Sequence, residues 1–211
     1  RRARGLPARL RRGIASRMSF RFPEGFVWGT ATAAHQVEGN NVNSDFWMLE
    51  HAPGSLFREP SGDACDHFHR YPEDVALLRQ LGFGAYRFSV EWARIEPEEG
   101  HFSVAALDHY RRMLACCHEH GVKPCVTFHH FTQPRWLALD GGLEDRANVD
   151  RFLRYCERTV RHLGDLIDTA YTINEANLSA TLQVAGVFPP GGLKAVAGFV
   201  GEAARRHGSS L

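Results

Sequence analysis

The chain has 211 residues, of which 44% are hydrophobic and 23% are charged, so it is long enough to form one sizeable globular core. This composition excludes a disordered or fibrous protein. The formal net charge is +1, but seven arginines lie within the first 17 residues, which contain no acidic residue, and residues 18–211 therefore carry −6. A mildly acidic body offers no basic face, so we expect no nucleic-acid partner.

Residues 1–18 are expected to form a basic leader, and the folded domain is expected to span residues 19–211. Met18 directly precedes the first patterned stretch, which favours upstream sequence or a disordered tail. An organelle transit segment is the alternative, because such segments are rich in arginine and poor in acids; no apolar stretch indicates secretion. No run approaches the ~18 apolar residues of a membrane span, so no membrane partner is expected.

Five cysteines are present, an odd number without a CxxC spacing, and Cys116 and Cys117 are adjacent. This pattern favours buried free thiols over a disulfide framework or a zinc site. Free thiols indicate a reducing compartment, and we expect a cytoplasmic location.

The first predicted elements are a strand, a helix and a second strand. Residues 26–33, FVWGTATA, are aromatic and β-branched, which suits a buried strand. Residues 71–82 follow as a helix, with Pro72 near its start, two acids in its first turn and Gly82 as its stop. Residues 85–90 then form the second strand.

The same order repeats in the next part of the chain. A second helix ends at Gly121, a third strand covers residues 122–128, a third helix covers 149–163, and a fourth strand covers 166–173. A last helical pattern covers residues 195–206. The second and third helices each place an apolar set on one face: Leu107, Tyr110, Leu114 and Cys117 in the second, and Val149, Phe152, Leu153, Cys156, Val160 and Leu163 in the third. Mostly apolar strands alternating with helices predict an α/β fold with parallel strands.

Polar side chains occur at or just after the end of every predicted strand. In α/β folds, active sites collect at the carboxyl ends of parallel strands, so we expect these side chains to converge. Sugar hydroxyls need hydrogen-bond donors and acceptors, and sugar C–H faces need aromatic platforms, so the set suits a polyhydroxylated ligand. The polar residues are His35, Gln36, Glu38, Arg87, Glu91, His129, His130, Asn174 and Glu175, with Trp28, Trp92 and Trp136 nearby.

Plainer explanations compete with these assignments. Arg87 could pair with a structural carboxylate. His129 and His130 could ligate a metal, but successive side chains of a strand point to opposite faces, so we expect one to pack and the other to face the cleft. The cluster GDACDHFHRY, residues 62–71, also invites a metal site, although we expect Asp66 and His67 to cap and staple the following helix instead.

Five stretches of the chain form a distinctive series that covers residues 20–192. They are FPEGFVWGTATAAHQVEG, GDACDHFHRYPEDVALLRQLGFGAYRFSVEWARIEP, GVKPCVTFHHFTQPRWL, YTINEAN and GVFPPG. In this order they resemble the amino-terminal half of the retaining β-glucosidases of glycoside hydrolase family 1. The resemblance implies a (β/α)8 TIM barrel, of which this chain supplies about the first four units.

The resemblance also implies a role for each matching residue. Glu175 corresponds to the general acid/base, and Asn174 to the residue that bonds the sugar 2-hydroxyl. Gln36 and His130 match positions that hold hydroxyls of the terminal sugar, and Arg87 matches the arginine that holds the nucleophilic carboxylate. The implied reaction is hydrolysis of terminal non-reducing β-D-glycosyl residues, from a β-glucoside or related oligosaccharide, with retention. Two carboxyl groups about 5 Å apart suffice for this chemistry, so no metal or organic cofactor is expected.

The second carboxyl group has no counterpart in the printed sequence. The family's nucleophile lies in a later motif of the TENG type, and nothing before Leu211 resembles it. Glu91 would need to face the cleft to replace it, and Glu38 lies in a loop. We therefore expect a fragment or an interrupted gene, inactive alone; the alternative is a non-catalytic sugar-binding relative. Open strand edges of a half-barrel would favour self-association.

Three departures from the family pattern stand out. Ala176 follows the Asn-Glu pair where proline is usual, and we expect it to loosen the backbone that aims Glu175. Phe131 and Thr132 stand where Trp-Asp is common, which is expected to alter sugar selectivity. Leu143 replaces a tryptophan.

Overall fold

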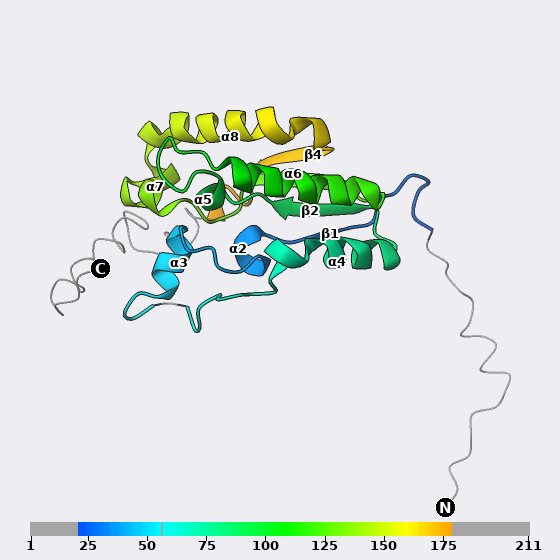
Figure 1. Cartoon of the computed structure of the whole chain (residues 1–211), viewed down its shortest axis with the longest axis horizontal. Coiled ribbons are helices and arrows are strands. Elements are labelled where there is room, and N and C mark those ends of the chain that lie inside the picture. Colours follow the sequence, from blue (N-terminus) through cyan, green and yellow to red (C-terminus); the bar gives the residue numbers. More distant parts are fainter. Residues whose placement is uncertain (1–20, 56, 179–211) are drawn as a thin grey trace, which may run out of the picture.

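The structure, a computed structural model, describes residues 21–55 and 57–178 (Figure 1). Four parallel strands form one sheet in the order β1-β2-β3-β4. The register aligns Ala31, Arg87, Cys125 and Thr169 across the sheet. The strands are β1 (Gly29–Ala31), β2 (Ala85–Ser89), β3 (Lys123–His129) and β4 (Thr169–Ile173).

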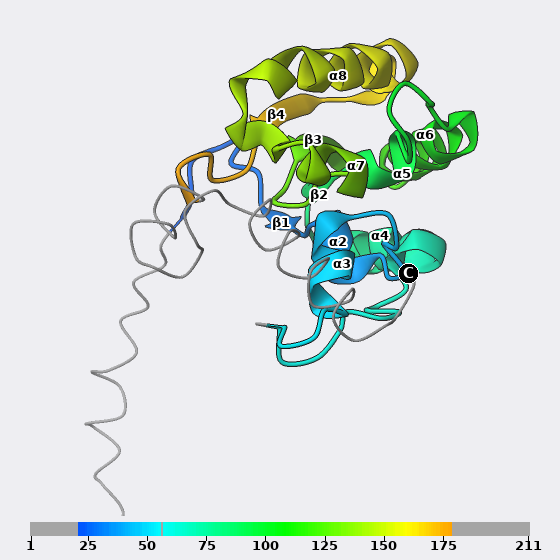
Figure 2. The same cartoon turned by 90° about the vertical axis from the view of Figure 1, so that its left-hand side faces the viewer.

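Three long helices connect these strands and cover one face of the curved sheet (Figures 1 and 2). They are α4 (His67–Gln80), α6 (Val104–Glu119) and α8 (Val149–Leu163). The predicted parallel α/β fold is therefore confirmed for the described residues. Shorter helical segments lie in the connections: α2 (Ala34–Val37), α3 (Asp45–Glu50), α5 (Trp92–Ile95), α7 (Arg135–Leu139), and the 3-10 turns η1 (Gly142–Glu144), η2 (Arg146–Asn148) and η3 (Gly164–Leu166).

The core lies between the sheet and the helices. The predicted apolar face of α6 is confirmed, because Leu107, Tyr110, Leu114 and Cys117 are all inaccessible to solvent. Tyr155 of α8 links three elements at the carboxyl end of the sheet. Its ring stacks on Trp92 with centroids 4.7 Å apart, and its hydroxyl donates to the carbonyls of Phe128, at 3.0 Å, and Val90, at 3.3 Å.

Replacing Tyr155 by phenylalanine is expected to lower the free energy of unfolding by about 1–2 kcal/mol, because two buried carbonyl oxygens lose their shared donor. Urea unfolding of the wild type and the variant measures the difference. Tyr171→Phe is the matched control, since Tyr171 is 44% exposed, and it should change stability by less than about 0.5 kcal/mol. Equal stability of the Tyr155 variant and the wild type would contradict the assigned hydrogen bonds.

The first strand is shorter than predicted. Pairing with β2 begins only at Gly29, where a Cβ atom would lie 3.0 Å from the Ala85 carbonyl oxygen. The preceding residues 26–28 were predicted to be part of a buried strand, but they are about half-exposed. Phe26 and Trp28 instead form an exposed aromatic cluster with Phe22, with ring centroids 4.5–5.0 Å apart. The rings of Phe26 and Trp28 thus pack with Phe22, while the Trp28 carbonyl accepts from the N–H groups of Gly84 and Ala85 at the start of β2.

The start of α4 also differs from the prediction. The helix begins at His67, so Pro72 lies inside it and not near its start. The predicted capping role of Asp66 is wrong: its φ of 52° is left-handed, its side chain bonds no backbone N–H, and it pairs with His69 Nδ1 at 2.6 Å. His67 is buried, and its ring bonds Asp74 at 2.6 Å and the Tyr86 hydroxyl at 3.1 Å. These contacts to helix and sheet hold the extra turn.

The third helix buries only part of the predicted apolar face: Leu163 is buried, and Phe152 and Cys156 are partly buried against the core. Tyr155, Thr159 and Leu163 are its buried residues, whereas Val149, Leu153 and Val160 are 46–57% exposed. The apolar residues of α8 thus divide between a side facing the sheet and an outer side, against which no other described helix packs. The fourth strand shows the same situation, since all five residues of β4 are exposed.

Several predictions lie outside the described residues, namely the basic leader, the GVFPPG stretch and the helix at 195–206. All five cysteines are free thiols, and of these Cys116 and Cys117 are buried. None of the helices within residues 21–55 and 57–178 has both the length and the apolar character that a membrane crossing requires.

Candidate active site

Arg87 of β2 joins three strands near the carboxyl end of the sheet. Its Nε donates to Thr127 Oγ1 of β3 at 2.9 Å, and its Nη2 donates to Asn174 Oδ1, just after β4, at 2.8 Å. The guanidinium carbon lies 4.8 Å from the centre of the Tyr171 ring. Within the described part of the chain, no carboxylate forms an ion pair with Arg87. This half-buried cation is thus available to an anion, and the structural-carboxylate alternative finds no support among these residues.

The two adjacent histidines have different surroundings. His129 packs edge-on against Phe152 of α8, with centroids 6.3 Å apart, and burial lowers its pKa to about 4. His130 lies in the field of Arg87; burial, and then this positive charge, lower its pKa to about 4. Both rings are therefore neutral at neutral pH. A neutral imidazole can donate one hydrogen bond and accept another, which suits a sugar hydroxyl.

Asn174 and Glu175 follow β4 directly. The Asn174 N–H donates to the His129 carbonyl at 2.8 Å, which ties the end of β4 to β3. Glu175 is exposed and has a left-handed φ of 47°.

The predicted site residues are only partly brought together. Arg87 contacts Asn174 directly and acts on His130 through its charge. Gln36 is exposed on α2, and the described residues give neither its side chain nor that of Glu175 a hydrogen-bond partner.

The side chain of Glu91 does not face a cleft. It is 2% exposed, and it accepts hydrogen bonds from Thr132 Oγ1 at 2.8 Å and from the Ala93 N–H at 3.1 Å. Thr132, one of the departures from the family pattern, therefore anchors the segment after His130 to the start of α5. Glu91 is not positioned to act as a substitute nucleophile.

Glu38 is likewise a buried anchor. Its carboxylate pairs with Arg94 Nε at 2.8 Å and accepts from the Tyr110 hydroxyl at 3.0 Å. Burial, opposed by the Arg94 charge, raises the pKa of Glu38 to about 7. The pair fixes the segment directly after α2, the helix that carries Gln36.

Asp45 is a third buried carboxyl group, and the sequence analysis missed it. Its Oδ1 accepts from the N–H groups of Phe46, at 2.8 Å, and Gln133, at 3.1 Å, whereas its Oδ2 has no partner among the described residues. Burial raises the pKa of Asp45 to about 7. Asp45 holds the loop after β1 against the loop after β3. The only sequence signal was Ser44-Asp45 at a helix start, which does not reveal burial.

The expected aromatic platforms are not available at the strand ends. Trp92 is 1% exposed, and its Nε1 donates to Glu96. Trp136 is half-buried and donates to the Glu96 carbonyl, whereas Trp28 precedes β1 and so lies at the opposite end of the sheet. His35 is also occupied, because it is buried and bonded to Glu50 at 2.8 Å.

The two histidines of the cluster at residues 62–71 pair with different carboxylates: His69 with Asp66 inside the cluster, and His67 with Asp74 farther along α4. Nowhere in the described ranges do three His, Cys, Asp or Glu side chains come close enough together to hold a metal ion.

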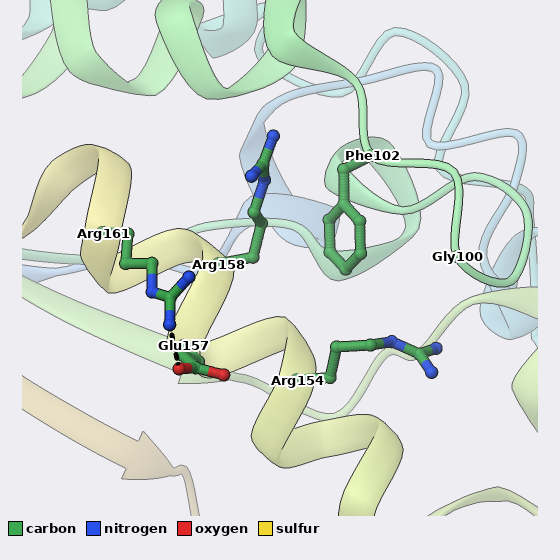
Figure 3. Close-up of a pocket in the computed structure, with 6 residues that line it drawn as sticks. All are labelled: Gly100, Phe102, Arg154, Glu157, Arg158 and Arg161. Atoms are coloured by element: carbon green, nitrogen blue, oxygen red, sulfur yellow. Dashed lines mark hydrogen bonds and ion pairs between the residues drawn. The ribbon is translucent and has the colours of Figure 1, made fainter.

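A hollow of about 380 Å³ lies between α8 and the segment of Gly100 and Phe102 that precedes α6 (Figure 3). Three arginines of α8 line it together with Phe102. Two of these arginines already have carboxylate partners: Arg154 bonds Glu96 at 2.8 Å, and Arg161 bonds Glu157 at 2.5 Å. This hollow contains none of the predicted site residues.

Comparisons with known proteins identify the family. The family described as glycosyl hydrolase family 1 matches residues 18–204. The chain belongs to glycosyl hydrolase family 1. Beta-glucosidase A of Acetivibrio thermocellus is 37% identical over 178 residues, which cover 81% of this chain and 40% of that protein. Beta-glucosidase A of Thermotoga maritima is 38% identical over 179 residues, which also cover 81% of this chain and 40% of that protein.

Solved structures agree with this assignment. The beta-glycosidase BGL167 is 64% identical, with a TM-score of 0.76, over 79% of this chain and 40% of the other. A family 1 β-glucosidase from Thermotoga maritima is 37% identical, with a TM-score of 0.75, over 82% of this chain and 40% of the other. The described fold is therefore part of a TIM barrel. The chain spans about 40% of the length of the relatives it matches.

Proposed function

We propose that this chain carries the acid/base half of the active site of a retaining β-glucosidase-type glycoside hydrolase. The observation that carries the proposal is the 2.8 Å hydrogen bond from Arg87 to Asn174. It places the Asn-Glu pair at the end of β4 beside a guanidinium that has no carboxylate partner in the described part of the chain. A retaining site needs a proton donor and an attacking carboxylate. A guanidinium without a carboxylate partner can hold that carboxylate through charge-assisted hydrogen bonds.

Each residue then has a defined task. Glu175 protonates the glycosidic oxygen and later activates water, and Asn174 bonds the 2-hydroxyl of the sugar. Gln36 and His130 hold hydroxyls of the terminal sugar, and Arg87 orients the nucleophile supplied by another part of the barrel.

The native protein that contains these residues is expected to release nitrophenol from an aryl β-glucoside and not from the α-anomer. Proton NMR of the first product should show the β-anomer of the free sugar, because two displacements retain configuration. A polypeptide of residues 1–211 alone should release no nitrophenol, since its sequence contains no motif that resembles the family's nucleophile motif.

Two outcomes would overturn this proposal. The α-anomer as first product would exclude the retaining mechanism. A native protein that binds the glucoside without hydrolysing it would favour the non-catalytic sugar-binding alternative.

A further inference from the structure

The backbone at Phe131, two residues after the end of β3, is strained. Its φ of 68° is left-handed, and Phe131 is the bulkiest of the five non-glycine residues with such a φ in the described ranges. The Thr132 N–H donates to the His130 carbonyl at 2.9 Å, which closes a γ-turn around Phe131. A left-handed φ is unfavourable for a bulky side chain, and this form of γ-turn is rare. Such a conformation persists only where neighbouring contacts fix it, and it is concentrated at active and binding sites.

Buried carboxyl groups fix the turn from its carboxyl-terminal side. The Thr132 hydroxyl donates to Glu91 Oε2 at 2.8 Å, and the N–H of the next residue, Gln133, donates to Asp45 Oδ1 at 3.1 Å. Thr132 is 4% exposed and Glu91 is 2% exposed, so water does not compete for their hydrogen bond. Glu91 is itself held in place, because its N–H donates to the Tyr110 hydroxyl at 3.0 Å. The turn is therefore attached to groups that belong to other segments of the chain.

The turn also determines where the His130 ring points. A histidine that binds a ligand through one ring nitrogen is usually oriented by a hydrogen bond of the other. His35 and His67 have such a bond to a carboxylate, at 2.8 and 2.6 Å. In His130, by contrast, Nδ1 is buried and has no hydrogen-bond partner in the described part of the chain. The His130 ring instead meets the Phe131 ring, with centroids 4.7 Å apart and planes at 76°, so the turn and this contact orient the imidazole.

We infer that Thr132 is a positioning residue for sugar binding: by bonding Glu91 it holds the strained turn that orients the His130 imidazole. The inference rests on the proposed function, in which His130 holds a hydroxyl of the terminal sugar. A hydrogen bond weakens steeply when its angle or length changes, so a small displacement of the imidazole is enough to reduce the affinity for the sugar. Glu91 then serves the site as the buried acceptor that anchors Thr132.

A double-mutant cycle on the native protein that contains these residues tests the inference. Thr132→Val keeps the shape of the side chain but removes the hydroxyl, and it should weaken binding of a non-hydrolysable β-thioglucoside about tenfold. In a His130→Ala background the same change should weaken binding less than about twofold, because the ring that Thr132 positions is then absent. Isothermal titration measures the four dissociation constants. The values of kcat/KM on an aryl β-glucoside should follow the same pattern.

Further variants separate positioning from general damage to the fold. Thr132→Ser keeps the hydroxyl and should bind the thioglucoside within about threefold of the wild type. Thr159→Val is the matched control: Thr159 is also buried, but it belongs to α8 and not to the turn, and its variant should bind within about twofold of the wild type. Circular dichroism shows whether each variant folds. If Thr132→Val does not, the cycle is measured with Thr132→Ala, whose smaller side chain leaves space for a water molecule to bond Glu91.

Equal losses of affinity in the two backgrounds would overturn the inference, because Thr132 would then act independently of His130. It is also overturned if Thr132→Ser weakens binding as much as Thr132→Val, since the hydroxyl would then have no part in the effect, or if His130→Ala leaves the affinity unchanged. Failure of the proposed function is distinguishable from these results. A wild type that binds the thioglucoside but does not hydrolyse the aryl glucoside would contradict the hydrolase activity, and the cycle of dissociation constants would still test the role of Thr132.

Discussion

Replacing Glu175 by glutamine is expected to lower kcat of the native protein on a β-glucoside by about 10²–10⁴-fold, the usual contribution of one general acid/base. Glutamine keeps the shape of the side chain but can neither donate a proton to the leaving oxygen nor accept one from water. Both steps of the retaining reaction should therefore slow. Glu175 is exposed, so its replacement should leave the free energy of unfolding within about 0.5 kcal/mol of the wild type.

Two measurements distinguish this role from a general loss of function. Azide needs no general base to attack a glycosyl-enzyme intermediate, so added azide should restore turnover of an activated aryl glucoside by the Glu175 variant and yield a glycosyl azide. Glu119→Gln is the matched control, because Glu119 is exposed at the carboxyl-terminal end of α6, before β3 begins, and its variant should keep wild-type kcat. A Glu175 variant that retains more than a tenth of wild-type kcat without azide would exclude Glu175 as the acid/base.

The order of elements could be predicted from the sequence because local patterns determine it. Helix α6 packs one face on the sheet and exposes the opposite face to solvent. The helical period of its apolar residues therefore identifies the buried ones. In α8 the same reasoning succeeded for Phe152, Cys156 and Leu163, which pack against the core, but not for the other apolar residues. Leu153 and Val160 share the helical period but lie on the outer side, and hydrophobicity does not record which flank of a helix has a neighbour.

The proximity of Arg87 and Asn174 was predictable for a different reason. Arg87 and Asn174 are 87 positions apart, and no local pattern joins them; the family motifs and the rule for parallel strand ends do. The functions of the buried side chains could not be predicted in this way. Trp92 and Glu91 follow a strand end, as a binding residue would. The Trp92 ring instead stacks on Tyr155, and the Glu91 carboxylate accepts a hydrogen bond from Thr132. Both partners come from distant segments of the chain. The position of a residue in the sequence therefore indicates which end of the sheet it lies near, but not which distant residue its side chain contacts.

Asp45→Asn is expected to change the pH dependence of stability by about 3 kcal/mol between pH 5 and pH 8. Burial raises the pKa of Asp45 from 3.8 to about 7 in the folded chain. A carboxyl group with a raised folded pKa holds its proton preferentially in the folded state, so its contribution to stability is present at low pH and is lost as the pH rises through 7. At pH 5, two units below the folded pKa, the preferential protonation adds about 3 kcal/mol to the free energy of unfolding, at 1.36 kcal/mol per pH unit. An amide at position 45 does not titrate and should lack this loss.

Comparing the wild type with Asp45→Asn separates the contribution of Asp45 from those of the other titrating groups. His109, His129 and His130 have pKa values lowered to about 4, so their contribution to stability is lost as the pH falls from 6.5 toward 4 and opposes that of the carboxyl groups. The histidines and Glu38 are common to wild type and variant, and their effects cancel in the difference.

Urea unfolding at pH 5 and at pH 8 measures this difference. Between these two pH values, the free energy of unfolding of the wild type should fall by about 3 kcal/mol more than that of Asp45→Asn. Asp150→Asn, which alters an exposed carboxyl group of α8, should run parallel to the wild type. If Asp45→Asn also runs parallel, Asp45 is ionised throughout this range, and a cation or donor must then satisfy the Oδ2 atom that has no partner among the described residues.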